Sequence, residues 1–233
     1  MIEAEAKIST IIKRTYNVKS FRVQLPGSIV FQAGQFLSVT LNKGGNLKRY
    51  LSISNSPTEE GYLEFTKKIT QSDFSQNLDS FKGGEMLIIR YPFGRFVLDE
   101  PQRKTAFISG GIGITPIRSI CKYVVDSNLG TDIVLLYANR TFQDIAFYED
   151  FKVMQEQYPR LKVRHVLSEG ISQNDCVIGK INEAFIKEEV SDFRERKFYL
   201  CGPPQMVEAM RKILSTELNL PTTQIITENF QGY

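Results

Sequence analysis

The chain has 233 residues, 42% hydrophobic and 24% charged, as in an ordinary soluble globular protein large enough for two domains. Its net charge of +3 is spread without a basic block, which argues against a nucleic-acid-binding protein. Residues 1–5 carry two acids and are followed by no long apolar stretch, so we expect no secretory signal. Apolar runs stay far below the ~18 residues of a membrane helix. We therefore expect no membrane span and a cytoplasmic location.

Cysteine is scarce in this sequence. Cys121, Cys176 and Cys201 form no Cys-x-x-Cys pair, so the usual local signature of a zinc site or of a cysteine-ligated iron–sulfur cluster is missing. We expect no bound metal. The odd number of cysteines fits a reducing compartment better than a disulfide framework.

The first hundred residues predict short β-strands separated by Gly, Pro and Asn. Regularly spaced strands with turn signals are typical of an antiparallel sandwich or barrel. One short helix is expected at residues 74–81. The predicted strands are residues 21–25, 35–41, 62–66 and 86–90.

From Lys104 onward the pattern alternates between strand and helix. This alternation predicts a parallel sheet with helices on both faces, which binds ligands at the carboxyl ends of its strands. We place the domain boundary near Glu100-Pro101, giving domains 1–100 and 101–233. The predicted strands are residues 105–109, 132–137, 161–167, 197–201 and 224–227, and the predicted helices are residues 116–126, 147–158, 182–189 and 204–218.

A glycine-rich turn opens the second half, in the segment Phe107-Ile-Ser-Gly-Gly-Ile-Gly-Ile-Thr-Pro116. Thr115 is a good N-cap and Pro116 suits the first helical position, so the free N–H groups of a helix would face a pyrophosphate. The spacing differs from the dinucleotide fingerprint G-x-G-x-x-G, because Pro116 replaces the third glycine. No acid ends the next strand, which reads Tyr137-Ala-Asn-Arg140. Taken alone, the segment fits either a nucleotide loop or a tight turn without ligand.

Two other segments stand out. Arg49 and Tyr50 begin a hydroxyl-rich stretch ending at Pro57, which by itself is an unremarkable strand. The segment Phe198-Tyr-Leu-Cys-Gly-Pro-Pro-Gln-Met206 places special backbone at the carboxyl end of a predicted strand, where ligands sit. Its thiol, Cys201, is either activated by the helix N-terminus or a buried structural cysteine.

The order R-x-Y-S, G-G-x-G-x-T-P, C-G-P-P closely resembles the ferredoxin–NADP reductase superfamily over essentially the whole chain. Pro92-Phe-Gly-Arg-Phe96 resembles the family's G-P-x-G-x-F turn, with Tyr91 in place of the first glycine. Phe74-Ser75 and the terminal Glu228-Asn-Phe-Gln-Gly-Tyr233 also match family features. The resemblance implies an antiparallel β-barrel that binds FAD, followed by an α/β parallel-sheet domain that binds NAD(P), without an iron–sulfur domain.

The resemblance assigns the flavin to the barrel. Arg49 would pair with the flavin phosphates, Tyr50 would pack on the isoalloxazine, and Ser52 would place its hydroxyl near N5, which receives hydride. Backbone N–H groups of Phe74 and Ser75 would face the pyrophosphate, which favours FAD over FMN. The remaining flavin-binding candidates are Leu51, Lys67 and Ile69.

The nicotinamide nucleotide is assigned to the second domain. Gly111, Gly113 and Thr115 would hold its pyrophosphate, and Cys201 would shape the approach to nicotinamide C4. Glu228 is a candidate polar partner or proton relay, and Tyr233 would cover the flavin and move aside for nicotinamide. The other nucleotide-binding candidates are Gly110, Pro116, Asn139, Arg140, Gly202, Pro203 and Met206.

The family implies an NAD(P)H-dependent flavin oxidoreductase that passes electrons from FAD to a separate acceptor, such as a ferredoxin-like protein, a haem protein or a small oxidant. The alternatives are an electron-transfer subunit of a larger complex and a non-catalytic redox-sensing module. Arg140 fits either NADPH or plain adenine-ribose binding, so the choice of NADH or NADPH stays open. Lys180 replaces Arg in a G-R-I-like turn, and His165 is expected to be structural. The oligomeric state is also open.

Overall fold

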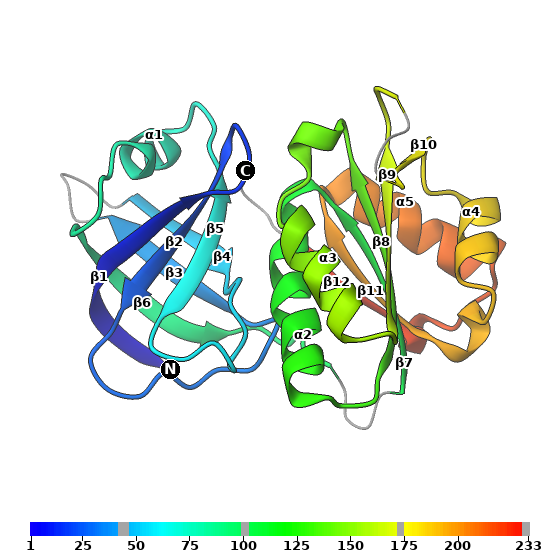
Figure 1. Cartoon of the computed structure of the whole chain (residues 1–233), viewed down its shortest axis with the longest axis horizontal. Helices are drawn as coiled ribbons and strands as arrows, with labels where there is room; N and C mark the ends of the chain where they lie inside the picture. Colours follow the sequence, from blue (N-terminus) through cyan, green and yellow to red (C-terminus); the bar gives the residue numbers. More distant parts are fainter. Residues whose placement is uncertain (42–46, 99–102, 172–174, 230–233) are drawn as a thin grey trace.

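A computed structural model describes residues 1–41, 47–98, 103–171 and 175–229 of the chain. Two sheets stand side by side, an antiparallel barrel and a parallel sheet flanked by helices (Figure 1). The predicted fold class is confirmed. The predicted boundary at Glu100-Pro101 lies outside the described residues and stays a prediction. Among the described helices, none combines the length and apolar character that crossing a membrane requires.

The barrel is built from strands in the order β4-β3-β6-β1-β2-β5, each antiparallel to its neighbour. An isolated bridge between Ile53 and Phe65 brings its two edges together. Helix α1 (Asp73–Asp79) lies at one end, capped by the Ser72 hydroxyl. The strands are β1 (Ile2–Lys13), β2 (Val18–Gln24), β3 (Phe36–Leu41), β4 (Leu47–Ser52), β5 (Leu63–Lys68) and β6 (Met86–Phe93).

Strand β1 has no counterpart among the predicted strands, although its sequence alternates. Ala6 and Ile8 point into the barrel core, whereas Glu5 and Lys7 are exposed. The alternation of buried and exposed residues was hard to detect in the sequence, because the buried positions include small Ala side chains. Tyr91, the residue that departs from the family turn, is buried in the same core.

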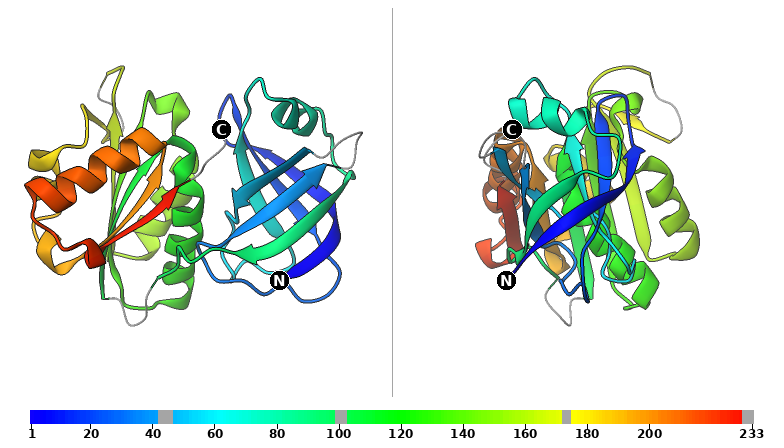
Figure 2. Two further views of the ribbon diagram at one scale, coloured as in Figure 1. Left: turned by 180° about the vertical axis from the view of Figure 1, so that it is seen from behind. Right: turned by 90° about the vertical axis from the view of Figure 1, so that its left-hand side faces the viewer.

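The second sheet is parallel throughout, in the order β10-β9-β8-β7-β11-β12. Helices α2 and α3 cover one face and α4 and α5 the other (Figures 1 and 2). The strands are β7 (Lys104–Gly110), β8 (Asp132–Asn139), β9 (Leu161–Leu167), β10 (Val177–Ile178), β11 (Lys197–Gly202) and β12 (Ile225–Asn229). The helices are α2 (Ile114–Ser127), α3 (Tyr148–Gln157), α4 (Glu183–Glu189) and α5 (Pro204–Lys212), the last continuing as a π-helical turn, Ile213–Glu217.

Helix α2 joins the two halves of the molecule. Ile114, Ile117, Cys121 and Val124 recur at helical spacing and are fully buried. The cluster they form also contains Val18, Ala33 and Phe96 of the first half, so one apolar core runs from the parallel sheet to the barrel. Figure 1 shows α2 between the sheet and the barrel.

The start of α2 differs from the prediction. The helix begins at Ile114 with Gly113 as its N-cap, so Thr115 is not the N-cap and Pro116 is not the first helical residue. The Thr115 hydroxyl instead donates to the carbonyl of Ile112, at 3.1 Å. A 3-10 turn over Gly111–Gly113 advances the helix by two residues, because glycine permits the chain to coil directly out of the strand.

Candidate functional site

The centre of the parallel sheet is where the strand order reverses. Strand β7 continues through α2 to β8 on one side, whereas β11 continues through α5 to β12 on the other. The carboxyl ends of β7 and β11, at Gly110 and Gly202, therefore lie beside each other. Crevices at such a point are the usual ligand sites of open α/β sheets.

Glycines allow the two loops at this point to touch through their backbones. A Cβ atom added to Gly113 would lie 2.4 Å from the Cys201 carbonyl oxygen, and one added to Gly202 would lie 3.0 Å from the Gly110 nitrogen. Gly111 differs from both: its φ is +52° and nothing lies within 4 Å of its added Cβ. Gly113 and Gly202 thus allow close packing, whereas the space beside Gly111 is open.

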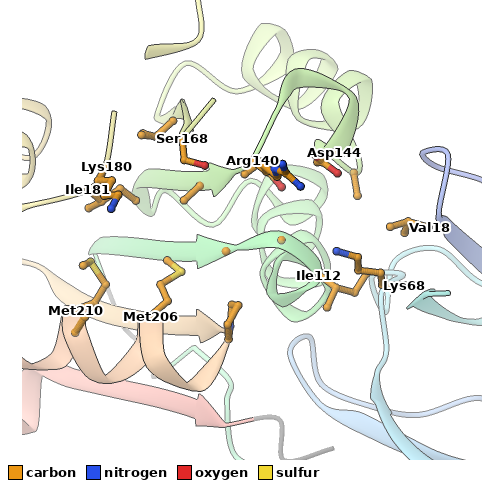
Figure 3. A pocket seen from close by; sticks show the side chains of 18 of the residues that line it. Val18, Lys68, Ile112, Arg140, Asp144, Ser168, Lys180, Ile181, Met206 and Met210 are labelled. Atoms are coloured by element: carbon orange, nitrogen blue, oxygen red, sulfur yellow. The ribbon is translucent and has the colours of Figure 1, made fainter. Parts of the chain in front are cut away.

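A cleft of about 460 Å³ opens at these strand ends (Figure 3). Both halves of the molecule line it. The barrel contributes Tyr16, Asn17, Val18 and Lys68. The second half contributes the following residues, among them five of the nucleotide-binding candidates besides Gly111: Gly110, Gly111, Ile112, Ala138, Asn139, Arg140, Asp144, Ala146, Val166, Ser168, Gly179, Lys180, Ile181, Pro203, Met206, Ala209 and Met210.

Polar groups gather around this cleft. Asn139 is 8% exposed, and neither polar atom of its amide has a hydrogen-bonding partner among the described residues. Burying a polar group without a partner costs free energy of folding, unless the group hydrogen-bonds to a ligand or to water. The Tyr16 hydroxyl donates to Asp144 at 2.8 Å, from the barrel to the second half. Arg140 donates to Glu169 at 2.8 Å, and both side chains are largely exposed.

Five of the predicted nucleotide-site residues are buried and do not line the cleft, Cys201 and Gly202 among them. Gly113, Thr115 and Pro116 are buried where α2 packs on the sheet, and none of them lines the cleft. Within the glycine loop, Gly110, Gly111 and Ile112 are the lining residues. The loop is therefore a close-packed turn whose first two glycines line the cleft.

On the barrel, Arg49 and Lys67 bring two positively charged side chains close enough to repel each other. Lys67 is buried, and its pKa is lowered by burial and by the neighbouring charge of Arg49. The Arg49 guanidinium lies 5.7 Å from the centre of the Phe74 ring, at the start of α1, and donates to the Lys48 carbonyl. Two cations that repel each other here fit the phosphates of a dinucleotide, because an anion between them relieves the repulsion.

The aromatic surface beside these cations is open. Tyr50 is 54% exposed and meets Phe36 and Phe93 edge-to-face, with ring centres 5.8 and 6.0 Å away. Ser52 is buried at the end of β4, and Leu51 before it is partly exposed. An exposed aromatic ring held by two others fits a flat ring system.

The remaining flavin candidates serve local structure as well. The N–H of Ser75 donates to the Ser72 hydroxyl at 3.4 Å, so the helix cap uses a donor that we had assigned to a pyrophosphate. The N–H of Ile69 donates to the Asn17 carbonyl at 2.8 Å. Phe74 is fully buried.

Cys201 and Glu228 are register partners in β11 and β12. Burial and the nearby Glu228 charge raise the pKa of the Cys201 thiol, so the alternative of an activated thiolate is wrong. Burial also raises the pKa of Glu228.

Tyr233, the predicted flavin cover, lies outside the described residues. Burial lowers the pKa of His165 to about 4, and its ring packs 5.2 Å from that of Tyr148.

The sequence prediction missed several cleft residues. Ser168 and Lys180 follow β9 and β10, so the rule that ligands meet the carboxyl ends of parallel strands applies to them. Lys68 and Tyr16 come from the barrel, and only the packing of the two halves brings them to the cleft.

Comparison with known families agrees with this architecture. The family model of the oxidoreductase FAD-binding domain matches residues 5–98, and that of the oxidoreductase NAD-binding domain matches residues 107–212. Together the two models span most of the chain, in the domain order of the ferredoxin–NADP reductase superfamily. The chain therefore carries a FAD-binding domain followed by an NAD-binding domain.

Individual relatives are distant. The chain is 27% identical, over 88% of its length, to the glycine betaine monooxygenase reductase subunit of Chromohalobacter salexigens, and 28% identical, over 89%, to the ferredoxin reductase component of 3-ketosteroid-9-alpha-monooxygenase of Mycobacterium tuberculosis. It spans only 58% and 57% of these proteins. Its fold matches a Neisseria gonorrhoeae ferredoxin NADP+ reductase with bound FAD and NADP, with a TM-score of 0.83, 20% identity and coverage of 98% and 99% of the two chains.

The two glycines of the loop predict different mutant behaviour. Gly113→Ala places its Cβ against backbone and should lower the free energy of unfolding by about 1–3 kcal/mol. Gly111→Ala should cost only about 1–2 kcal/mol through its left-handed φ, yet weaken nucleotide binding. Urea unfolding and nucleotide titration of both variants check this. Unchanged nucleotide affinity in Gly111→Ala would contradict the role given to Gly111.

Proposed function

We propose that this chain is an NAD(P)H-dependent flavin oxidoreductase that takes hydride from NADH or NADPH onto bound FAD and passes electrons to a separate acceptor. The observation that carries the proposal is the cleft at the ends of β7 and β11, because the FAD-binding and NAD-binding domains both line it. A nucleotide bound there lies next to the barrel, as hydride transfer between two cofactors requires.

The described residues fit both cofactors. Arg49 and Lys67 supply positive charge for the FAD phosphates, and Tyr50 supplies a face for the flavin ring. Gly111 and the unpartnered Asn139 amide supply backbone and side-chain groups for the nicotinamide nucleotide. FAD, when bound, accepts two electrons as hydride and releases them one at a time.

We propose Ser52 and Cys201 as neutral groups that border the reacting rings. Both are buried, and the raised pKa of the Cys201 thiol keeps that thiol protonated at neutral pH. A neutral lining excludes water without adding charge where hydride moves. We assign Glu228 as a polar partner of nicotinamide, and its raised pKa suits an acid that holds its proton longer than usual. Tyr233 remains the proposed flavin cover.

We propose a protein electron carrier of an oxygenase system as the acceptor. The reductase subunits and components named above support this choice, since each is named as part of a monooxygenase. A haem protein or a small oxidant would be served by the same chemistry. Fold alone does not distinguish them.

Anaerobic stopped-flow absorbance of the FAD-loaded protein tests the proposal. Mixing with NADH and NADPH separately should bleach the flavin band, and the faster donor identifies the physiological nucleotide. Protein that holds FAD but is bleached by neither nucleotide would point to the redox-sensing module. Protein that never retains FAD would refute the proposal itself.

Removing the Arg49 charge should weaken FAD binding. A charge-assisted hydrogen bond to phosphate is worth about 1.5–3 kcal/mol, so Arg49→Ala should raise the FAD dissociation constant about 10- to 100-fold. Fluorescence titration of apoprotein with FAD measures this. Arg211→Ala is the matched control, because Arg211 is a half-exposed arginine on α5 paired with Glu208. Equal effects of the two substitutions would exclude a specific role for Arg49.

The ion pair between Arg140 and Glu169 bears on nucleotide choice. Glu169 competes with a 2′-phosphate for Arg140, at the rim of the cleft. Because an exposed pair is screened by solvent and weak, Glu169→Gln should raise kcat/KM for NADPH relative to NADH only modestly, by up to about fivefold. Glu208→Gln, which breaks an equally exposed pair on α5, should leave the ratio unchanged. A ratio unaltered by Glu169→Gln would remove Arg140 from the phosphate site.

A further inference from the structure

A network of ion pairs crosses the boundary between the barrel and the second half. None of its members lines the nucleotide cleft. We call this group of residues the interdomain ion network, and its members are Arg14, Arg22, Glu59, Glu64, Arg118 and Asp150.

Arg118 is the centre of this network. It lies on α2, is 5% exposed, and donates twice to Glu59 of the barrel and twice to Asp150 of α3. It also donates to the Ser54 carbonyl of the barrel, at 3.2 Å. A planar guanidinium satisfies all these acceptors at once, which an ammonium group cannot do.

Glu64, on the barrel side of the network, is also buried. Glu64 is 1% exposed and accepts from Arg14 at 3.2 Å, from Arg22 at 2.9 Å and from the Ser54 hydroxyl at 2.9 Å. Arg14 also reaches Asp150 across the boundary, at 3.5 Å. Three cations and three carboxylates are thus joined in one continuous chain that passes from one domain to the other.

Arg118 connects the segment after β4 to the helix that begins at the glycine loop. It stands one helical turn after Ile114, on the helix that starts at the glycine loop. Its acceptor Ser54 lies two residues after Ser52, the residue proposed to face the flavin. The next residue along the helix, Ser119, donates to the Asn55 carbonyl at 2.6 Å. Two adjacent residues of α2 therefore bond to two adjacent residues that follow β4. We call β4 the flavin strand, because it carries the flavin-binding candidates Arg49, Tyr50 and Ser52.

This arrangement matters for hydride transfer because that step is very sensitive to distance. A displacement of about 1 Å can reduce the rate about 100-fold. A rigid connection between the nucleotide loop and the flavin strand would set that distance. Movement of α2 relative to β4 would change it while leaving each binding site intact.

We propose that Arg118 is a positioning residue for hydride transfer, holding the nucleotide loop at the start of α2 in register with the flavin strand through its bonds to Ser54 and Glu59. This inference rests on the proposed function. Arg118 touches neither substrate nor cofactor, and it acts through the backbone of the two segments that do.

Arg196 provides a matched control. It is also 5% exposed and is paired with two carboxylates, Asp132 and Asp192, and it donates to the Thr105 carbonyl at 3.1 Å. All of these partners belong to the second domain. Replacing either arginine by lysine leaves the charge but removes the planar fork, so Arg118→Lys and Arg196→Lys should both lower the thermal unfolding midpoint.

The FAD-loaded variants are mixed with saturating NADH or NADPH under anaerobic conditions, and the limiting rate of flavin bleaching is measured with protiated and 4-deuterated nucleotide. We expect Arg118→Lys to lower this rate about 10- to 100-fold with a persisting isotope effect and unchanged nucleotide affinity. Arg196→Lys should change the rate less than about twofold. Equal rates in the two variants would overturn the proposal.

Glu59→Gln is a second variant for the case in which Arg118→Lys does not fold. Glutamine keeps the shape of Glu59 and one hydrogen-bonding oxygen but removes the negative charge. We therefore expect the limiting rate of flavin bleaching to fall measurably, but less than in Arg118→Lys. A wild-type rate in Glu59→Gln would overturn the proposal. A wild-type protein that neither nucleotide bleaches would instead refute the proposed function, so the two failures are distinguishable.

Discussion

The close approach of two backbones at the centre of the parallel sheet is the constraint on which the rest of the site depends. The turn after β7 and the turn after β11 touch, with the Cys201 carbonyl where a side chain on Gly113 would lie. This contact lets α2 leave the sheet at once, and it leaves Gly111 facing outward. It also directs α2 towards the barrel, so that both domains line one cleft. A side chain on Gly113 would push the two turns apart.

Much of the architecture was predictable from the sequence, because its signals are local. Apolar runs bounded by Gly and Pro predicted a strand at residues 161–167, and β9 has these bounds. The order of the motifs indicated both domains. Strand β1 was missed because alanine and charged residues weaken its alternation. The start of α2 was misplaced because Thr115 and Pro116 carry strong capping preferences, which the glycine turn before them overrides.

The candidate site was less predictable for a different reason. Its nucleotide side lies at strand ends, and Gly111 and Asn139, which were predicted at such ends, line the cleft. Its barrel side depends on how two separately folded units pack, which no local pattern encodes. Tyr16 reaches Asp144 from 128 residues away in the chain. Nothing local in the sequence distinguishes Arg118 on its helix, and only its pairing with Glu59 and Asp150 reveals its position at the boundary.

The burial of the thiols has a consequence for the lifetime of such a protein. Cys121, Cys176 and Cys201 are all buried without disulfides, and burial raises the pKa of each. A reduced flavin exposed to air generates peroxide, and peroxide attacks thiolates far faster than thiols. Enclosed, protonated cysteines would therefore resist the peroxide that the proposed flavin chemistry releases when its acceptor is scarce.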